Sequence, residues 1–151
     1  MFKVIVCGGR DYAQLFYVGA IVRHDTEAAR NRALQDQKAM DIALGKVSKL
    51  AESTGRKLQV ITGGAPGADR YAYCWAMKQI VANRVFHADW GRHGKAAGPM
   101  RNQAMLSHGA DLVVAFPGGR GTADMTRRAE TAKVPVWRPV TGEEIPKLDD
   151  E

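Results

Sequence analysis

The sequence predicts an α/β domain of three layers, in which a mainly parallel sheet of about five strands lies between helices. Two observations predict this class. Short apolar runs recur along the chain and are nearly continuous, as expected for parallel strands covered on both faces. Helical stretches separate these runs, which gives the alternation of a parallel sheet. The expected strands span residues 2–7, 58–62, 84–88, 112–116 and 134–137, of which 84–88 carries the weakest pattern.

Four helices are expected between these strands. Residues 39–52 carry apolar side chains at the spacing of a helix that is buried along one face. These side chains are Met40, Leu44, Val47 and Ala51, with Ile42 widening the stripe. The other expected helices cover residues 69–82, 97–108 and 122–133. Pro99 falls in the first turn of the helix over 97–108, where proline is tolerated.

Residues 13–38 do not fit the simple alternation. Residues 15–22 are apolar, whereas 24–37 are mostly polar and charged. We interpret the stretch as a helical insertion or extension ahead of the first crossover helix. It has three possible roles: an arm for a homodimer or higher homo-oligomer, a lid over the site, or a longer connection, which is the default. The chain is expected to form one domain over residues 1–140, followed by a C-terminal tail over 141–151.

Composition indicates a folded protein with anionic partners. The chain has 151 residues, of which 45% are hydrophobic and 25% charged, so it can bury a core without disulfides or metal. The net charge of +6 fits phosphorylated small molecules or nucleic acid, and also a plain solvated surface. No apolar run approaches the roughly 20 residues that span a bilayer, and the start lacks signal-peptide features. We therefore expect a cytoplasmic protein without membrane contact.

Cysteine and histidine do not point to a metal. Cys7 and Cys74 are expected to be small buried residues. The four histidines show no zinc-ligand spacing with them. The prediction is therefore no metal and no cofactor.

Glycine-rich segments follow three of the expected strands. Glycine allows a tight turn and a close backbone approach to a ligand, and the helix N-terminus behind it attracts anions. In an open parallel sheet these segments meet at the carboxyl ends of the strands. They predict a phosphate site, although any single loop is equally compatible with a plain tight turn. The predicted site residues are Gly8, Gly9 and Arg10, then Gly63, Gly64, Gly67 and Asp69, then Gly118, Gly119, Arg120, Gly121 and Thr122.

The last of these loops is the sharpest signal. Its glycines can present several N–H groups to one phosphate, and Thr122 can cap the following helix or donate its hydroxyl. The loop lacks the spacing and the Lys-Ser/Thr pair of a Walker A sequence, and the dinucleotide fingerprint would follow the first strand instead. The sequence therefore indicates neither ATP hydrolysis nor nicotinamide chemistry.

Three further residues are candidates, and they have structural alternatives, as does Asp69. Arg101 and Asn102 lie in the first turn of the helix over 97–108, where a cation opposes the helix dipole. Arg101 is therefore expected to meet a ligand anion, or a carboxylate of Asp69 or Asp124. Asp69 is expected first of all to cap its helix. Trp90 either packs in the protein, which is the favoured interpretation, or stacks on a base or ribose.

The motifs, taken in order, resemble the YspA-type branch of the SLOG superfamily, which includes LOG phosphoribohydrolases and DprA-type DNA-processing proteins. They lie at residues 8–12, 63–69, 88–102 and 115–124. The resemblance runs from residue 2 to about 138, apart from 13–38, and a match over most of a chain is informative about its fold. It implies a Rossmann-like fold, a nucleotide or nucleotide-sugar ligand, and an occurrence in bacteria and phages.

LOG enzymes cleave the N-glycosidic bond of a nucleoside monophosphate, and their signature is Pro-Gly-Gly-x-Gly-Thr-x-x-Glu with an essential Arg on the preceding helix. Residues 117–122 match that signature, and Arg101 falls where the essential Arg would be. The glutamate position holds Met125 instead. Asp124 is one residue earlier, about 100° away around a helix. The resemblance therefore carries over phosphate binding more readily than hydrolysis.

Three functions remain open from the sequence. The leading hypothesis is a protein that binds a nucleotide-derived phosphate compound as a sensor, carrier or sequestering protein. The second is a nucleotide N-glycosidase that uses Asp124 or Asp69 as the acid, together with Arg101. The third is a binder of single-stranded nucleic acid, which ranks last because aromatic residues are only 7% of the chain and are not interleaved with a basic run.

Overall fold

The computed structural model describes residues 1–14 and 27–148. Five strands form one sheet in the order β3-β2-β1-β4-β5, and every neighbouring pair is parallel. At its centre, Val4 of β1 pairs with Val60 on one side and Leu112 on the other. The strands are β1 Phe2–Cys7, β2 Leu58–Thr62, β3 Ala82–Val85, β4 Leu112–Ala115 and β5 Val136–Trp137. The predicted α/β class is confirmed.

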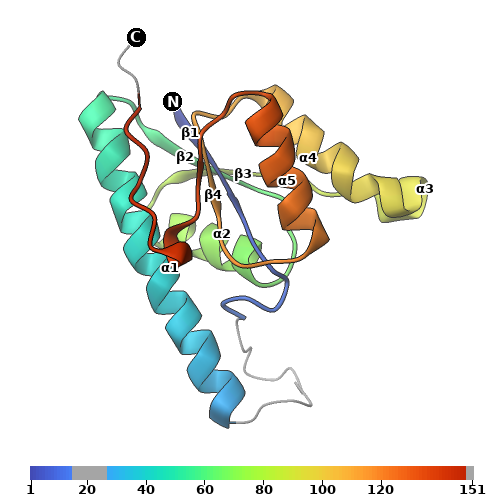
Figure 1. The fold of residues 1–151 in the computed structure, drawn as a ribbon, viewed down its shortest axis with the longest axis horizontal. Coiled ribbons are helices and arrows are strands. Elements are labelled where there is room, and N and C mark those ends of the chain that lie inside the picture. Colours follow the sequence, from blue (N-terminus) through green and yellow to red (C-terminus); the bar gives the residue numbers. More distant parts are fainter. Residues whose placement is uncertain (15–26, 149–151) are drawn as a thin grey trace.

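Helices cover both faces of this sheet (Figure 1). Helices α1 (Glu27–Thr54) and α2 (Ala68–Lys78) pack on one face, and α4 (Ala97–His108) and α5 (Arg120–Thr131) pack on the other. The short α3 (Trp90–His93) and a 3-10 turn, η1 (Gly94–Ala96), precede α4, and a second one, η2 (Pro139–Thr141), follows β5. This arrangement is Rossmann-like. In the described ranges no helix is long and apolar enough to cross a membrane.

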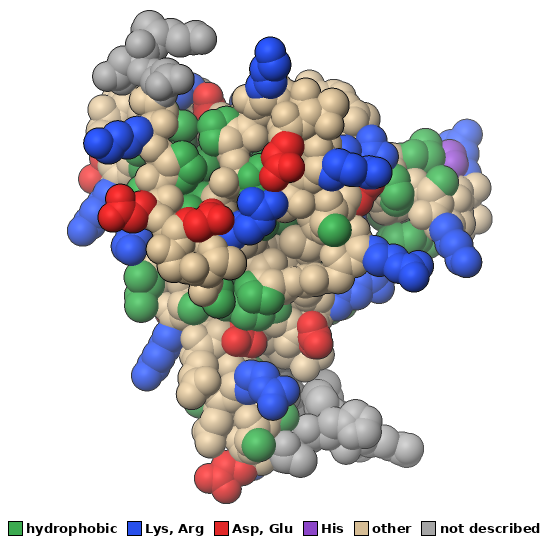
Figure 2. All heavy atoms as spheres, viewed as in Figure 1, with side chains coloured by type: hydrophobic (Ala, Val, Ile, Leu, Met, Phe, Trp, Pro, Cys, Tyr) green, Lys and Arg blue, Asp and Glu red, His purple; other side chains and the backbone are tan. Residues whose placement is uncertain are grey.

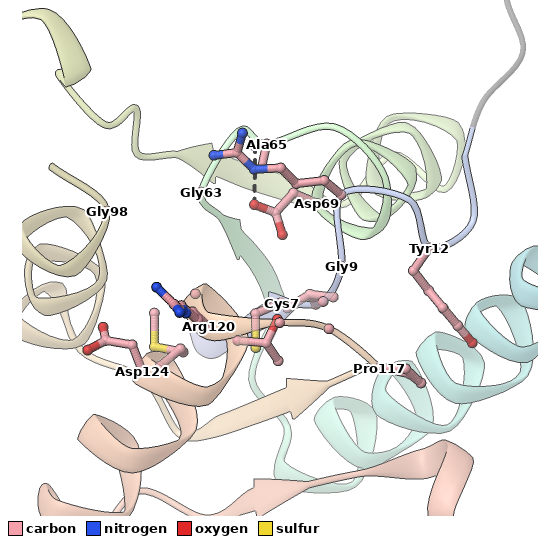
Figure 3. A pocket seen from close by; sticks show the side chains of 18 of the residues that line it. Cys7, Gly9, Tyr12, Gly63, Ala65, Asp69, Gly98, Pro117, Arg120 and Asp124 are labelled. Atoms are coloured by element: carbon pink, nitrogen blue, oxygen red, sulfur yellow. Dashed lines mark hydrogen bonds between the residues drawn. The ribbon is translucent and has the colours of Figure 1, made fainter. Parts of the chain in front are cut away.

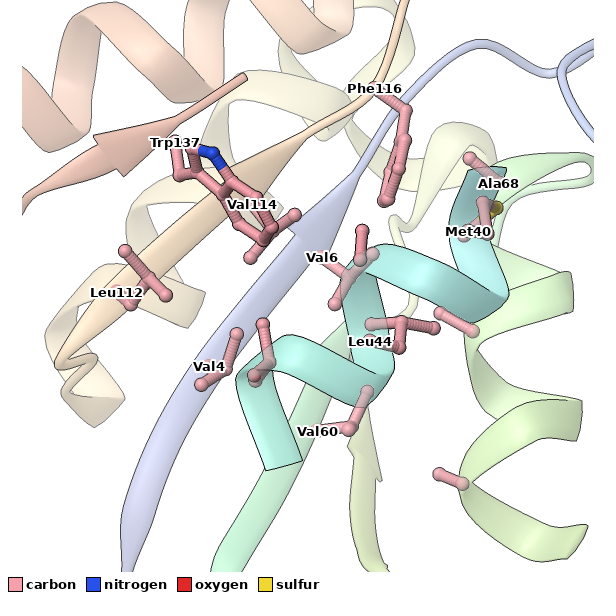
Figure 4. Close-up of a cluster of buried hydrophobic side chains, with 14 of the residues drawn as sticks. Val4, Val6, Met40, Leu44, Val60, Ala68, Leu112, Val114, Phe116 and Trp137 are labelled. Atoms are coloured by element: carbon pink, nitrogen blue, oxygen red, sulfur yellow. The ribbon is translucent and has the colours of Figure 1, made fainter. Parts of the chain in front are cut away.

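The larger core cluster lies between the sheet and helices α1 and α2. Alternate residues of β1, including Val4 and Val6, meet Met40 and Leu44 of α1 there (Figure 4). Trp137 closes the cluster at β5, where its indole N–H donates to the carbonyl of Glu143. Met40, Leu44, Val47 and Ala51 are buried as predicted.

The smaller cluster fills the opposite face beneath α4 and α5. Ile5 and Cys7 of β1 meet Met105 of α4 and Met125 of α5. Both methionines are buried, and both also line the cavity at the ends of the strands. The floor of that cavity is therefore continuous with the core.

Three helices have bounds different from the predicted ones. Helix α1 begins at Glu27, so the polar part of 13–38 that is described, residues 27–38, is helical as expected. Ile42 is exposed and does not widen the buried stripe. Helix α2 ends at Lys78, because Ile80 adopts a left-handed conformation (φ 57°) and the chain turns into β3 by Ala82.

Helix α5 begins two residues before its predicted start. Gly119 is its N-cap, so Gly121 and Thr122 lie in the first turn rather than in a loop. The predicted strands over 84–88 and 134–137 are also shifted or shortened, because β3 pairs with β2 only over residues 82–85 and β5 with β4 only over 136–137. The apolar segment 15–22 lies outside the described residues.

Two other expectations were wrong at the surface. Cys74 is exposed, whereas Cys7 is buried as predicted. Leu148, which was expected in a C-terminal tail, packs with Ile145 against the larger core cluster.

Candidate functional site

The strand order reverses between β1 and β4, and a cavity of about 1360 Å³ lies at their carboxyl ends. This is the place where open α/β sheets bind ligands. The two strand ends are joined there, because the N–H of Gly9 donates to the carbonyl of Pro117 over 2.8 Å. Figure 3 shows the side chains of Cys7, Arg120 and Asp124 around this cavity, with Asp69 on its other side.

The N-terminus of α5 borders the cavity, and no side chain among the described residues caps it. Gly119 is the N-cap and makes no side-chain cap bond, and no acidic residue lies in the first turn. The N–H groups of Arg120, Gly121 and Thr122 therefore have no helix carbonyl to bond to, and the positive end of the helix dipole is uncompensated. All three residues line the cavity.

Thr122 does not cap α5, which corrects the prediction. It is the third residue of the helix, and its side chain packs over Gly118 so closely that a Cβ at position 118 would collide with its hydroxyl oxygen. Gly118 is therefore needed to let the loop fold back on its own helix. The hydroxyl remains beside the first-turn N–H groups.

Arg101 is positioned by the backbone of another strand end rather than by a carboxylate. Its Nη1 donates to the carbonyl of Gly63 over 2.7 Å, and its Nε donates to Oδ1 of Asn102 over 3.0 Å. Neither Asp69 nor Asp124 forms an ion pair with it in the described residues, so the alternative of a salt bridge is not what the structure shows. Burial lowers the pKa of Arg101, opposed by the charge of Asp69. The half-buried guanidinium lines the cavity with a positive charge.

Asn102 is a junction between helices rather than a free ligand contact. Its Nδ2 donates to the carbonyl of Gly121 over 3.2 Å and to Oδ2 of Asp124 over 3.0 Å, while Oδ1 accepts from Arg101. Both amide hydrogens and the oxygen are thereby used within the protein. The side chain is buried and fixes α4 against the first turn of α5.

Asp124 is engaged in ion pairs. Its carboxylate accepts from Arg127 over 2.7 Å and from Arg128 over 2.9 Å. Burial raises the pKa of Asp124, but the hydrogen bonds from Asn102 and Arg128 outweigh burial, so the pKa is lowered overall. An ionised carboxylate in this position is a poor proton donor, so the predicted role as a catalytic acid is weakened.

Asp69 closes the loop between β2 and α2 and does not cap the helix. The N-cap is Gly67, and the Asp69 carboxylate accepts from the N–H of Ala65 over 3.2 Å (Figure 3). Burial raises the pKa of Asp69 to about 6, although that hydrogen bond and the charge of Arg101 oppose the rise. The buried carboxyl lines the cavity.

The predicted glycines divide into two groups. Gly8, Gly9, Gly63, Gly118, Gly119 and Gly121 line the cavity. Gly64 instead borders a smaller hollow of about 270 Å³ beside His87. Gly67 (φ 78°) packs against the carbonyl oxygens of Gly9 and Arg10. It lines neither the cavity nor the smaller hollow. These two glycines let loops pack together and do not face the cavity.

The rim of the cavity brings together residues far apart in the chain. Trp90 of α3 is 47% exposed, and the guanidinium of Arg10 lies 5.6 Å from its ring centroid. Helix α1 contributes cavity-lining residues that sequence reasoning missed, together with neighbours in the loop after β1 and in the η1 turn before α4. They are Asp11, Tyr12, Arg32, Gln35, Asp36, Ala39 and Lys95. No local motif marks those on α1, and the only sequence signal for them is their position on the helix just ahead of Met40, within about two turns.

Basic side chains are spread over the molecule, and several of them lie near the elements that border the cavity. In the space-filling view they lie over α5 and around the projecting α3 end (Figure 2). The cavity itself is lined by Arg10, Arg32, Lys95, Arg101 and Arg120, against the acids Asp11, Asp36, Asp69 and Asp124. Five cations face four carboxylates among the described residues, and Asp124 is already paired with Arg127 and Arg128, so the balance of charge inside the cavity is positive.

Comparisons with known proteins identify the family of the chain. The sequence model described as "YspA, cpYpsA-related SLOG family" matches residues 2–93, from β1 to the end of α3. The Gene 61 protein of Mycobacterium phage D29 is 45% identical over 86 residues, which cover 52% of this chain and 69% of the phage protein. No solved structure shows a significant match. The chain belongs to the YspA, cpYpsA-related SLOG family.

Proposed function

We propose that this protein binds a phosphorylated, nucleotide-derived small molecule in the cavity between β1 and β4, as a sensor, carrier or sequestering protein. The observation that carries the proposal is the uncapped, acid-free N-terminus of α5 at the cavity wall. Three N–H groups point along the helix axis from residues with no intrahelical acceptor, which is the arrangement that binds phosphate in other α/β folds.

Two cations complete the proposed anion site. Arg101 is held by Gly63 and Asn102, so its charge is fixed in place before a ligand arrives. Arg120 is exposed in the first turn of α5 and is free to fold over a phosphate. A fixed guanidinium loses little entropy on binding, which favours affinity.

The remainder of the cavity suits the other parts of a nucleotide. Its volume of about 1360 Å³ exceeds what one phosphate needs and lies above the usual range of small-ligand sites, about 300–1000 Å³. Asp11, Gln35 and Asp36 line it from the β1 loop and α1. Carboxylate and amide oxygens accept hydrogen bonds from sugar hydroxyls.

Hydrolysis of an N-glycosidic bond is the second candidate, and one observation favours it. Asp69 is a buried cavity carboxyl whose raised pKa, about 6, suits a general acid near neutral pH. Against it, Met125 occupies the position of the LOG glutamate, and Asp124 is tied to two arginines. Incubation with nucleoside monophosphates followed by chromatography tests it, and we expect no free base. Release of base that is lost in Asp69→Asn would establish the hydrolase instead.

The binding proposal is tested by thermal unfolding with ribose 5-phosphate, nucleoside monophosphates and nucleoside diphosphate sugars. A ligand at 100 times its dissociation constant stabilises the folded state by about 2.7 kcal/mol, which is measurable as a rise in Tm. Arg101→Ala is expected to remove most of the rise. Arg120→Ala tests the same site with little risk to folding, because Arg120 is exposed, and is expected to weaken binding about ten-fold.

Lys57→Ala is the matched control. Lys57 is exposed and directly precedes β2, so it lies at the opposite edge of the sheet while carrying the same charge. Its loss should leave the rise in Tm unchanged. If no phosphorylated compound raises Tm, or if Lys57→Ala and Arg120→Ala weaken binding equally, the proposed site is wrong. Binding of an oligonucleotide with a steep salt dependence, but of no mononucleotide, would favour the nucleic-acid alternative.

A further inference from the structure

The rim of the cavity carries a large aromatic side chain that the phosphate site does not use. Trp90 is 47% exposed, whereas Trp137 is almost fully buried and Trp75 is partly buried against the core. Trp90 lines the same cavity as the α5 N-terminus but comes from α3, a separate part of its wall. A half-exposed indole at the mouth of a large cavity is a surface on which a flat ring can stack.

The orientation of Trp90 is fixed from both sides. The outer edge of its benzo ring rests on Gly98 of α4, where a Cβ would lie 3.0 Å from Cη2. Its backbone is held in a turn by Asp89, whose carboxylate accepts from the N–H of Arg92 over 3.2 Å. Gly98 lies at the cavity edge in Figure 3. The ring is therefore held in place while nearly half of the side chain stays exposed.

Arg10 shows which way the indole faces. Its guanidinium comes from the loop after β1 and lies over the ring, 5.6 Å from the centroid. That loop is part of the cavity wall, so the ring looks across the cavity mouth rather than only into solvent. A ring that already holds a flat cation presents its electron-rich face to the cavity.

From these contacts we infer that Trp90 is the stacking platform for the planar base of the ligand, so that the cavity takes a nucleotide with its base rather than a sugar phosphate alone. The inference rests on the proposed phosphate site and adds a ring subsite on the part of the cavity wall that α3 provides. The base stacks on the indole at the α3 rim while the phosphate lies at the α5 N-terminus. Stacking of this kind does not depend on which base the nucleotide carries, because every base has a flat face.

The test compares two probes that differ only in the base, adenosine 5′-monophosphate and ribose 5-phosphate, by calorimetry. We expect the monophosphate to bind wild type more tightly than the sugar phosphate. Trp90→Ala should weaken the monophosphate about ten-fold and leave the sugar phosphate unchanged. Trp90→Phe keeps a flat ring and should recover part of the loss. Trp75→Phe is the matched control, and it should change neither affinity.

Tryptophan fluorescence provides a second measurement. A purely structural role of Trp90 would not make its emission change when the monophosphate binds. Binding of the monophosphate should quench tryptophan emission in wild type and in Trp75→Phe, but not in Trp90→Phe. Equal weakening of both probes by Trp90→Ala, or quenching that persists in Trp90→Phe, would overturn the ring subsite while leaving the phosphate site intact. If neither probe binds and Arg120→Ala has no effect, the proposed function fails first.

Discussion

Two strand ends of this protein look alike in sequence and behave differently in the structure. Both the β2–α2 and the β4–α5 connections are rich in glycine, and each leads into a helix N-terminus. At α2, Asp69 occupies the first turn, and the N–H of Ala68 donates to the carbonyl of Gly9 over 3.1 Å. At α5 the first turn holds no acid, and a Cβ at Gly119 or Gly121 would meet nothing within 4 Å.

The difference shows what separates a structural glycine loop from a candidate anion site. The β2–α2 end uses its positive dipole within the protein, since a carboxylate lies in its first turn and a neighbouring carbonyl accepts its first N–H. The β4–α5 end leaves the same groups open to the cavity. Glycine content alone therefore does not identify a phosphate site. Whether such a helix N-terminus can bind phosphate depends on two features: an acidic residue in its first turn, and the groups that lie beside each glycine.

The largest expected effect is a loss of stability on substitution of Gly67, in the β2–α2 loop, which the corresponding substitution in the β4–α5 loop should not cause. Gly67→Ala places a Cβ against the carbonyl oxygens of Gly9 and Arg10 at a positive φ of 78°. Backbone strain and overpacking together should lower the free energy of unfolding by about 3 kcal/mol or more. Urea unfolding measures it.

Gly121→Ala is the counterpart at the other loop. Its Cβ meets open space, so stability should stay within about 1 kcal/mol of wild type. Binding of nucleoside monophosphates should weaken, because the new methyl group projects beside the first-turn N–H groups. Equal destabilisation by both substitutions would remove the distinction between the loops.

The second prediction concerns the charge buried at the β2–α2 loop. Because the pKa of Asp69 is raised from 3.8 to about 6, the folded state binds a proton more tightly than the unfolded state, and stability falls as pH rises through that interval. Asp69→Asn removes the buried charge and keeps an oxygen for the N–H of Ala65. At pH 8 the variant should be more stable than wild type by up to about 3 kcal/mol. Urea unfolding between pH 4 and 8 should show the difference shrinking toward pH 4.

Asp124 at the α5 side supplies the control of opposite sign. Its pKa is lowered, so its ionised form contributes stability above the ordinary pKa of 3.8, and that contribution is lost as pH falls through its folded pKa. Asp124→Asn should therefore be less stable than wild type at neutral pH, with the difference vanishing in acid. The same sign for both variants would contradict the comparison.

A third prediction tests the hydrogen bonds that connect the end of β2 to the first turn of α5. Arg101 and Asn102 connect the carbonyl of Gly63, at the end of β2, to the carbonyl of Gly121, in α5. Asn102→Ala removes three hydrogen bonds from a buried position and should cost about 2 kcal/mol of stability. Phosphate affinity should fall as well, because Arg101 loses its Nε partner. Gln103→Ala, an exposed neighbour on α4, should affect neither quantity strongly. Unchanged phosphate binding in Asn102→Ala would show that the link does not position Arg101.

The smallest expected effect is at the Thr122 hydroxyl. Thr122→Val keeps the packing over Gly118 and removes one donor from the α5 end. The affinity for nucleoside monophosphates should fall about five-fold, or about 1 kcal/mol, with stability unchanged. Calorimetric titration measures it. An unaltered affinity would assign Thr122 to packing only.

The sequence by itself determined the α/β class, the central strands and the residues most deeply buried, since these follow from apolar runs and their spacing. It also predicted that the glycine-rich segments lie at the carboxyl ends of the strands, because the tight turns there favour glycine. The ends of α2 and α5 were misplaced by two to four residues, since a left-handed Ile80 and the N-cap at Gly119 depend on how the chain meets its neighbours.

Only the tertiary structure decided which of these strand ends opens into the cavity. It directed Arg101 to a carbonyl 38 residues away, tied Asp124 to arginines, and brought Trp90 and the first turns of α1 to the same rim. The physical reason is that helix ends, buried charges and cavity walls take their partners from across the sheet. Those partners are set by the order of the strands, which spacing along the chain does not encode.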